Sequence, residues 1–199
     1  MSRRPKLGKM PSLLAVLLVY GLALGAGAAF VLSSEMALPW RLLVADGIAT
    51  AIVFAASVLF DNSSVYDPYW SVFPPLVALP LVHAVAPPLD LRQALVLGLL
   101  WLWGARLTWN WARGWRGLVH EDWRYERFRQ TTGRAYWLVS ALGIHGFPTL
   151  IVALGCTSLL PALGLGRPFG WLDAVATVVT AGAMGIESLA DAQLRRGGR

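Results

Sequence analysis

Six long apolar stretches divide almost the whole chain, and this pattern restricts the fold more than any motif does. A helix that crosses a membrane needs roughly 20 consecutive, mostly apolar residues. Hydrophobic residues make up 56% of the chain and charged residues only 14%, whereas soluble domains carry about 25% charged residues. The sequence therefore predicts an all-α, polytopic membrane bundle of about six transmembrane helices, built as a single integral membrane domain over residues 1–199. The expected spans are residues 12–32, 42–60, 68–86, 93–112, 137–160 and 171–190.

The third expected span is interrupted by three prolines, Pro74, Pro75 and Pro80. Each proline removes a backbone hydrogen-bond donor and crowds the preceding helical turn. A membrane helix tolerates such residues when neighbouring segments satisfy the freed carbonyl groups. We therefore expect this span to be kinked or partly re-entrant.

The distribution of basic residues predicts the topology of the bundle. Lys and Arg accumulate in cytoplasmic loops of membrane proteins. With the N-terminus inside, thirteen of the seventeen basic residues fall on the cytoplasmic side, in residues 1–9, 113–134 and 195–199. The sequence thus predicts a multi-pass protein with both termini in the cytoplasm, in a bacterial inner membrane or a eukaryotic endomembrane. Anionic lipid headgroups account for the net charge of +6 better than nucleic acid does, so no nucleic-acid partner is expected.

Polar side chains form a stripe on the fourth expected span. Arg106, Asn110 and Arg113 recur at a spacing of four and three residues, which places them on one face of a helix. An arginine at the centre of a span costs about 2.5–3.5 kcal/mol on insertion scales, so Arg106 needs a partner or a route to water. Two interpretations remain open: the side chain snorkels to the boundary, or it contacts a carboxylate or a ligand.

The segment that follows this span, residues 113–136, is the longest polar loop expected in the chain. Its six arginines stand beside Glu121 and Asp122, with Arg124 and Tyr125 directly after them. Arginine suits phosphate because its planar guanidinium is permanently charged and donates in a fork. From charge alone, contact with anionic lipid explains the loop. The interleaved aromatic residues favour a second interpretation, in which the loop binds an anionic cofactor.

The last expected span ends in a second polar stripe, Glu187, Asp191 and Arg195, at a spacing of four residues. A carboxylate near the end of a span is a candidate functional group. The structural alternative is a helix-end ion pair between Asp191 and Arg195, which would contribute a few tenths of a kcal/mol if exposed.

Two further residues have both a structural and a functional interpretation. Asp67 precedes Pro68 and would cap the helix that begins there, or it would belong to a site. His145 lies in the fifth expected span without a spaced partner, and Cys156 is the only cysteine. The sequence therefore predicts no metal site and no internal disulfide, and it makes His145 a packing or cavity residue.

Four segments in a fixed order carry a family resemblance. Residues 62–71 read NSSVYDPYWS, residues 106–115 read RLTWNWARGW, residues 120–125 read HEDWRY and residues 143–149 read GIHGFPT. Together they resemble the DUF1295 family over most of the chain from Asp61 onward. That family is grouped with the steroid 5-alpha-reductase C-terminal domain, and more distantly with sterol reductases and isoprenylcysteine methyltransferases.

The resemblance implies a membrane reductase that uses NADPH to reduce a conjugated carbon–carbon double bond in a steroid or another lipid. Glu187, Asp191 and Arg195 resemble the acidic and basic residues with which those reductases contact the cofactor. The other expected cofactor-binding residues are Arg106, Asn110, Glu121, Asp122, Arg124 and Tyr125. The catalytic acid is expected among Tyr66, Asp67 and Tyr69, on the same predicted face of the membrane as the arginine loop.

In the related reductases, further helices follow the segment that resembles residues 187–195 and complete the cofactor pocket. This sequence ends at Arg199, so the resemblance predicts a chain that lacks those helices and is inactive or incomplete by itself. Two alternatives to the reductase remain. The chain would be a lipid methyltransferase that uses S-adenosylmethionine, or a non-catalytic membrane module that packs against another helical protein.

Overall fold

The computed structural model describes residues 7–85, 88–164 and 168–197, and the described residues form helices without any strand. This confirms the predicted all-α class. The α-helices are α1 (Lys9–Ser33), α2 (Leu38–Leu59), α3 (Tyr69–Val85), α4 (Leu91–Gly114), α5 (Trp123–Thr132), α6 (Tyr136–Val139), α7 (Phe147–Cys156), α8 (Leu159–Gly164) and α9 (Trp171–Gly197). Short 3-10 segments, η1 (Ser63–Val65) and η2 (Gly133–Ala135), precede α3 and α6, and a π-helical segment, η3 (Ser140–Gly146), joins α6 to α7.

Among the described residues, four helical segments are long and apolar enough to cross a membrane: α1, α2, the continuous segment Trp123–Gly164, and α9. The third and fourth expected spans are not among them. α3 has only 17 residues, and α4 carries Arg92, Arg106 and Arg113. The structure thus supports a membrane protein, while the count of six spans stays a prediction. The prolines of the third expected span lie inside α3, which is assigned as one continuous helix, and the predicted kink is not confirmed.

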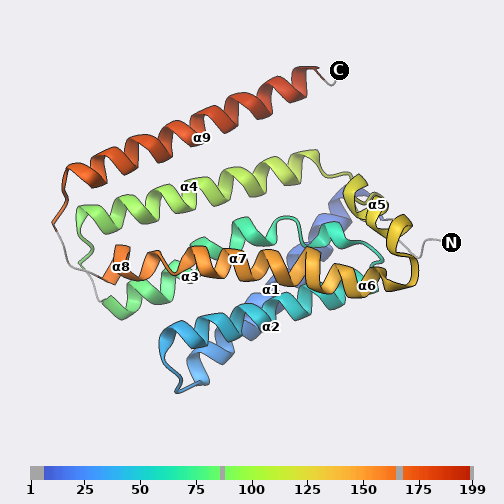
Figure 1. Cartoon of the computed structure of the whole chain (residues 1–199), viewed down its shortest axis with the longest axis horizontal. Helices are drawn as coiled ribbons and strands as arrows, with labels where there is room; N and C mark the ends of the chain where they lie inside the picture. The colour runs from blue at the N-terminus through green and yellow to red at the C-terminus, as the bar shows by residue number, and fades with distance from the viewer. Residues whose placement is uncertain (1–6, 86–87, 165–167, 198–199) are drawn as a thin grey trace.

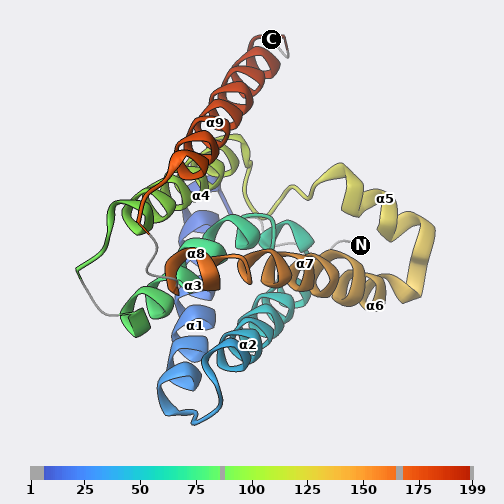
Figure 2. The same cartoon turned by 60° about the vertical axis from the view of Figure 1, so that its left-hand side comes forward.

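Helices α4, α7 and α9 run roughly along the long axis of the molecule (Figure 1), and α1 crosses them obliquely (Figure 2). The beginning of α1, the end of α9 and the whole of α5 lie at the same end of this bundle. That end therefore gathers Lys9 at the start of α1, the arginines that follow α4, and Arg195 and Arg196 at the end of α9. The cytoplasmic assignment of this end stays a prediction from charge.

Small residues let the helices approach each other closely. A Cβ added to Gly27 of α1 would lie 3.2 Å from the carbonyl oxygen of Ala45 in α2. Tyr20, Val53 and Tyr69 meet in the same core, between α1, α2 and α3. Large apolar side chains such as Leu18 are left on the outside, 74% exposed. Such outward apolar residues are expected where the surrounding solvent is lipid.

The closest approach between α3 and α4 occurs at Gly104. A Cβ at this position would lie 2.5 Å from the carbonyl oxygen of Ser71 and 2.8 Å from Cγ of Pro75. One turn further, the hydroxyls of Ser71 and Thr108 form a hydrogen bond of 2.9 Å. The helix that begins at the 66–71 motif is thus held directly against the helix that carries Arg106 and Asn110.

Gly104→Ala is expected to destabilise the fold by about 1–3 kcal/mol, because the added methyl group overlaps backbone and proline atoms that cannot rotate away. Gly98→Ala on the same helix is the matched control, since nothing lies within 4 Å of its added Cβ. The measurement is thermal unfolding of both variants in the same detergent. Equal melting temperatures for the two variants would show that α3 and α4 are not in contact at Gly104.

The π-helical segment places His145 inside the bundle. Pro148 has no N–H to donate to the carbonyl of Ile144, which favours a wider turn at this point. His145 is 1% exposed, with Nε2 3.1 Å from the Ser57 hydroxyl and Nδ1 2.9 Å from the carbonyl oxygen of Ser140. It is a buried, hydrogen-bonded side chain, as the sequence indicated.

Candidate functional site

A cavity of about 590 Å³ lies at the end of the bundle that carries α5. It is bounded by the start of α3, the last turns of α4, the start of α5, and α7. Half of the residues predicted as catalytic or cofactor-binding line it together: Tyr66, Asp67, Asn110, Asp122, Arg124 and Tyr125. Polar residues from three separate motifs, at positions 66–67, 110 and 122–125, thus form one polar cavity.

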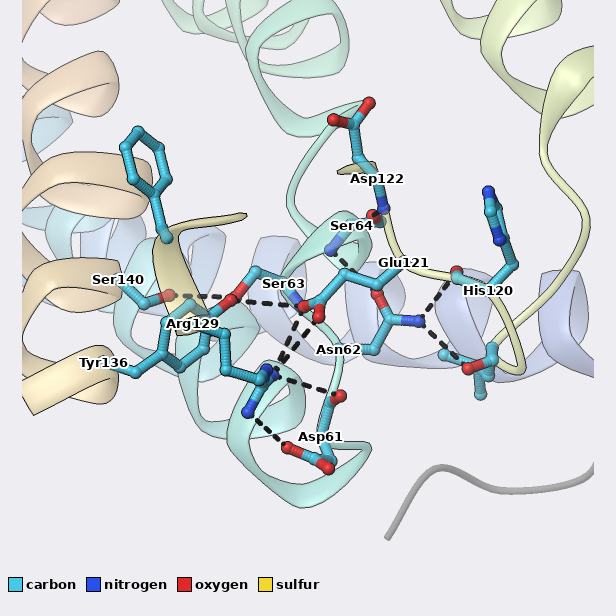
Figure 3. A network of polar contacts seen from close by, with 12 residues as sticks. Asp61, Asn62, Ser63, Ser64, His120, Glu121, Asp122, Arg129, Tyr136 and Ser140 are labelled. Atoms are coloured by element: carbon cyan, nitrogen blue, oxygen red, sulfur yellow. Dashed lines mark hydrogen bonds and ion pairs between the residues drawn. The ribbon is translucent and has the colours of Figure 1, made fainter. Parts of the chain in front are cut away.

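Two of the sequence motifs are joined by hydrogen bonds (Figure 3). The Asn62 side-chain amide donates to the carbonyl oxygens of Leu118 and His120, each at 3.0 Å. The backbone N–H of Asp122 donates to the Ser64 hydroxyl at 2.8 Å. The Asn62 side chain also accepts from the backbone N–H of Ser64. The polar side chains of residues 62–64 therefore fix where the segment of residues 118–122 lies, and so where α5 begins.

Glu121 lies beneath this junction and does not line the cavity. It is completely buried and accepts a hydrogen bond of 2.7 Å from the backbone N–H of Ser63. Tyr136 donates to the same carboxylate, and Arg129 pairs with it and also with Asp61 (Figure 3). The predicted cofactor residue Glu121 thus holds η1, α5 and α6 together from inside the protein.

Asp67 faces the cavity and forms its shortest polar contact. The Tyr125 hydroxyl donates to its carboxylate at 2.5 Å. Burial raises the pKa of Asp67 to about 7, although the hydrogen bond from Tyr125 acts in the opposite direction. At neutral pH a substantial fraction of Asp67 therefore carries a proton, which makes it a candidate acid. This hydrogen bond connects two separate motifs, because Asp67 belongs to residues 62–71 and Tyr125 to residues 120–125.

Asp122 behaves differently from Asp67 although it lines the same cavity. Its side chain caps α5 by accepting from the backbone N–H of Arg124, and the Arg124 guanidinium donates to both of its oxygens, at 2.8 and 3.1 Å. Partial burial alone would raise the pKa of Asp122, but these hydrogen bonds outweigh burial and lower it. The cavity therefore holds one carboxylate that stays charged and one that readily keeps a proton.

The expected loop of residues 113–136 contains helix α5, which corrects the sequence interpretation. Asp122 caps its first turn, and Gly133 ends it with a positive φ of 52°, a conformation that glycine adopts without strain. The helix gives its charged residues defined directions. Tyr125 and Arg129 are one turn apart and both face the bundle.

The two polar stripes of the sequence meet each other across α4 and α9. Arg106 forms ion pairs with Glu187 and with Asp191, the second at 2.8 Å, and Arg195 donates to the Asn110 side chain at 2.8 Å. Arg106 therefore contacts carboxylates, which is the second of its two interpretations. Asp191 pairs with Arg106 and not with Arg195, the partner that the structural alternative gave it. Of these residues only Asn110 lines the cavity, with Arg195 attached to it.

Tyr69, the third candidate acid, does not line the cavity. It is 2% exposed, and its hydroxyl donates to the Asp46 carboxylate of α2 at 2.7 Å. Asp46 is itself fully buried, and its second oxygen has no hydrogen-bond partner among the residues that the structure describes. Asp46 is not among the site residues predicted from the sequence, although a carboxylate in the middle of an apolar stretch is a signal that marks functional residues in membranes.

The cavity also carries a hydrogen-bond donor without a partner. Trp111 lines it, and its indole N–H is buried and makes no hydrogen bond in the described part of the chain. A buried donor without an acceptor costs about 1–3 kcal/mol. The indole N–H has almost no accessible surface, so other atoms of Trp111 form the cavity wall. No group of three or more His, Cys, Asp or Glu that could hold a metal ion occurs among the described residues.

An apolar cavity of about 510 Å³ adjoins the polar one. Trp70 and Val152 line both cavities, so these two side chains stand between them. The remaining wall is almost entirely apolar and comes from Pro74 of α3 and from α4, α7, α8 and α9. Its charged part is an ion pair between Arg92 and Asp173. A polar and an apolar compartment thus lie side by side.

Comparison with known proteins agrees with the motifs. No curated protein and no solved structure matches the chain. The model of the family described as "Protein of unknown function (DUF1295)" matches residues 53–196. This range contains η1, α3 to α9 and every residue that lines the polar cavity. The chain belongs to the DUF1295 family.

Proposed function

We propose that the protein is a membrane-embedded, NADPH-dependent reductase of a conjugated carbon–carbon double bond in a steroid or another lipid. The observation that carries the proposal is the pair of cavities: a polar one that joins the Asp67–Tyr125 contact to Arg124, beside an apolar one across Trp70. The relation of the DUF1295 family to steroid 5-alpha-reductases supports the same reaction class. Together these features fit a substrate with a polar reacting end and a large apolar body.

The residues of the polar cavity fit a nucleotide cofactor. Arg124 is a charged donor for phosphate oxygens. Asp122 is a charged acceptor suited to ribose hydroxyls. Arg195, attached to Asn110, adds positive charge at the cavity edge. The volume of about 590 Å³ lies within the range of about 300–1,000 Å³ that is usual for ligand pockets.

The chain's own groups supply the acid for this reaction. A bound reduced nicotinamide supplies the hydride that the β carbon of an enone accepts. Asp67 holds a proton that it can share with the carbonyl oxygen of the enone, which withdraws electrons from the β carbon. Tyr125 donates to Asp67 and orients its carboxyl group. Tyr66 lines the same cavity, and Thr149 holds its hydroxyl at 2.8 Å, so it is the second candidate donor.

The apolar cavity fits the body of a lipid substrate. Its lining comes from five helices and includes Leu99, Trp103 and Leu159. Burial of apolar surface there contributes about 25 cal/mol per Å² removed from water. A substrate that extends from Asp67 past Trp70 would place its apolar part in this compartment. The reacting double bond would then lie at the boundary between the two cavities.

The rate of reduction is expected to fall as the pH rises through about 7, because Asp67 acts in its protonated form and its pKa is about 7. Below pH 7 most of Asp67 is protonated, and above pH 7 most of it has lost the proton. Asp67→Asn should lower the rate by about 10²- to 10⁴-fold and remove this pH dependence. The assay is oxidation of NADPH by the purified protein in lipid nanodiscs, with progesterone as a steroid enone.

Asp90→Asn, at the cap of α4 away from the cavity, is the matched control and should keep both rate and pH profile. If Asp67→Asn and Tyr66→Phe both retain the wild-type rate, the acid is misassigned. If no enone is reduced at any pH while S-adenosylmethionine binds, the methyltransferase alternative replaces the reductase.

A further inference from the structure

One face of helix α5 is not covered by any other part of the described chain. None of its residues is buried. Trp123 is 67% exposed and Phe128 is 45% exposed, and Arg127 is exposed between them. At 3.6 residues per turn these three side chains fall within one half of the helix circumference. The face therefore combines two large aromatic groups with positive charge.

The opposite face of the same helix is fully engaged with the protein. Tyr125 donates to Asp67, and Arg129 pairs with Asp61 and Glu121. The guanidinium of Arg129 also lies 4.0 Å from the ring centre of Tyr136. These contacts fix the rotation of α5 about its axis, so its aromatic and basic face has a defined direction.

The position of α5 matches that of a helix at a membrane surface. It lies at the end of the bundle where α1 begins and α9 ends (Figure 1), and it stands away from the other helices (Figure 2). Arg113 and Arg116 are exposed in the segment that leads to it, and Val119 is 49% exposed there. Exposed apolar side chains at a bundle end, next to arginines, are typical of an interfacial helix.

We propose that α5 lies in the membrane interface and binds anionic phospholipid headgroups. Arg127 would pair with a headgroup phosphate, while Trp123 and Phe128 enter the boundary between headgroups and acyl chains. Charge complementarity selects this occupant, because the chain carries a net charge of +6 and anionic headgroups attract basic residues near the ends of spans. Helix α5 lies next to one end of α1, which is long and apolar enough to be such a span. The inward face of the same helix holds the Asp67 and Glu121 contacts, so lipid binding and the polar cavity share one rigid element.

The test is native mass spectrometry of the purified, delipidated protein with phosphatidylglycerol or phosphatidylcholine added. The wild type is expected to bind phosphatidylglycerol more tightly than phosphatidylcholine. Arg127→Gln should weaken the binding of phosphatidylglycerol about fivefold, the value expected for one basic residue at a membrane surface. Arg127→Lys, which keeps the charge, should retain most of the affinity for phosphatidylglycerol. Phe128→Ser should weaken the binding of both lipids.

Arg196→Gln is the matched control, because Arg196 is exposed at the same end of the bundle but on α9. Its effect should be clearly smaller than that of Arg127→Gln. An equal loss in both variants would mean that net charge alone attracts the lipid, and the proposal would be wrong. The same conclusion follows if Arg127→Gln binds phosphatidylglycerol as the wild type does. All variants replace exposed residues, so unchanged melting temperatures verify that they are folded.

Discussion

Glu121→Ala is expected to lower the stability of the protein by about 3 kcal/mol and to release α5 from the bundle. The carboxylate is completely buried and accepts from the backbone N–H of Ser63. Its loss leaves that donor unsatisfied, and it leaves the partly buried Arg129 with fewer acidic partners. Breaking a buried ion pair from one side typically costs about 3–5 kcal/mol, and the partial exposure of Arg129 places the expected value at the lower end.

The measurement is thermal unfolding by near-ultraviolet circular dichroism in detergent. The melting temperature of Glu121→Gln is expected to lie between those of the wild type and the alanine variant, because a glutamine oxygen can still accept from the backbone N–H of Ser63. Gln130→Ala removes an exposed side chain from the same helix and should change the melting temperature little. A Glu121→Ala variant as stable as Gln130→Ala would contradict the buried network of Figure 3.

Arg106→Ala is expected to detach α9 from α4. Met184 is the only residue of α9 that is buried among those described, and the ion pairs of Arg106 with Glu187 and Asp191 connect the two helices. Without the guanidinium, two carboxylates remain on a helix that faces lipid, where one such charge costs about 2.5–3.5 kcal/mol near the centre of a span. We therefore expect α9 to move until these carboxylates reach water or take up protons.

The separation of the helices can be measured with spin labels at Leu102 of α4 and Ile186 of α9, which are 61% and 70% exposed, in a Cys156→Ser background. Arg106→Ala should give a longer and broader distance distribution than the wild type. A triple variant that adds Glu187→Gln and Asp191→Asn removes the unpaired charges and should restore a narrow distribution. An unchanged distribution in Arg106→Ala would show that apolar contacts alone hold α9 in place.

The sequence predicts the class of the fold well, because length and hydropathy determine whether a helix can lie in a membrane. The long apolar stretches become α1, α2 and α9 with boundaries close to those expected. Helix α5 could not be found in this way, since it is short, charged on all sides and stabilised by tertiary contacts of Tyr125 and Arg129. Hydropathy also does not settle whether α3 and α4 are spans, because α3 is apolar but has only 17 described residues and α4 carries three arginines.

The sequence motifs indicated which segments contain the polar residues of the candidate site. They did not indicate which of these residues contact one another. Asp67 and Tyr125 were both candidates, but their direct contact depends on the register in which residues 62–64 bind residues 118–122. Glu121 and Tyr69 have the same chemistry as the cavity residues and yet point into the interior. Which way a side chain faces follows from packing, and a single sequence does not contain that information.

The most direct test of the reductase proposal is isothermal titration calorimetry, in which NADPH is added to the purified protein in nanodiscs. The account predicts saturable binding that Arg124→Gln weakens about tenfold or more, since one charge-assisted contact is lost, while Arg134→Gln on the neighbouring η2 leaves it unchanged. S-adenosylmethionine should give no saturable heat. Saturable binding of S-adenosylmethionine without any binding of NADPH, or indifference to both, would contradict the central claim.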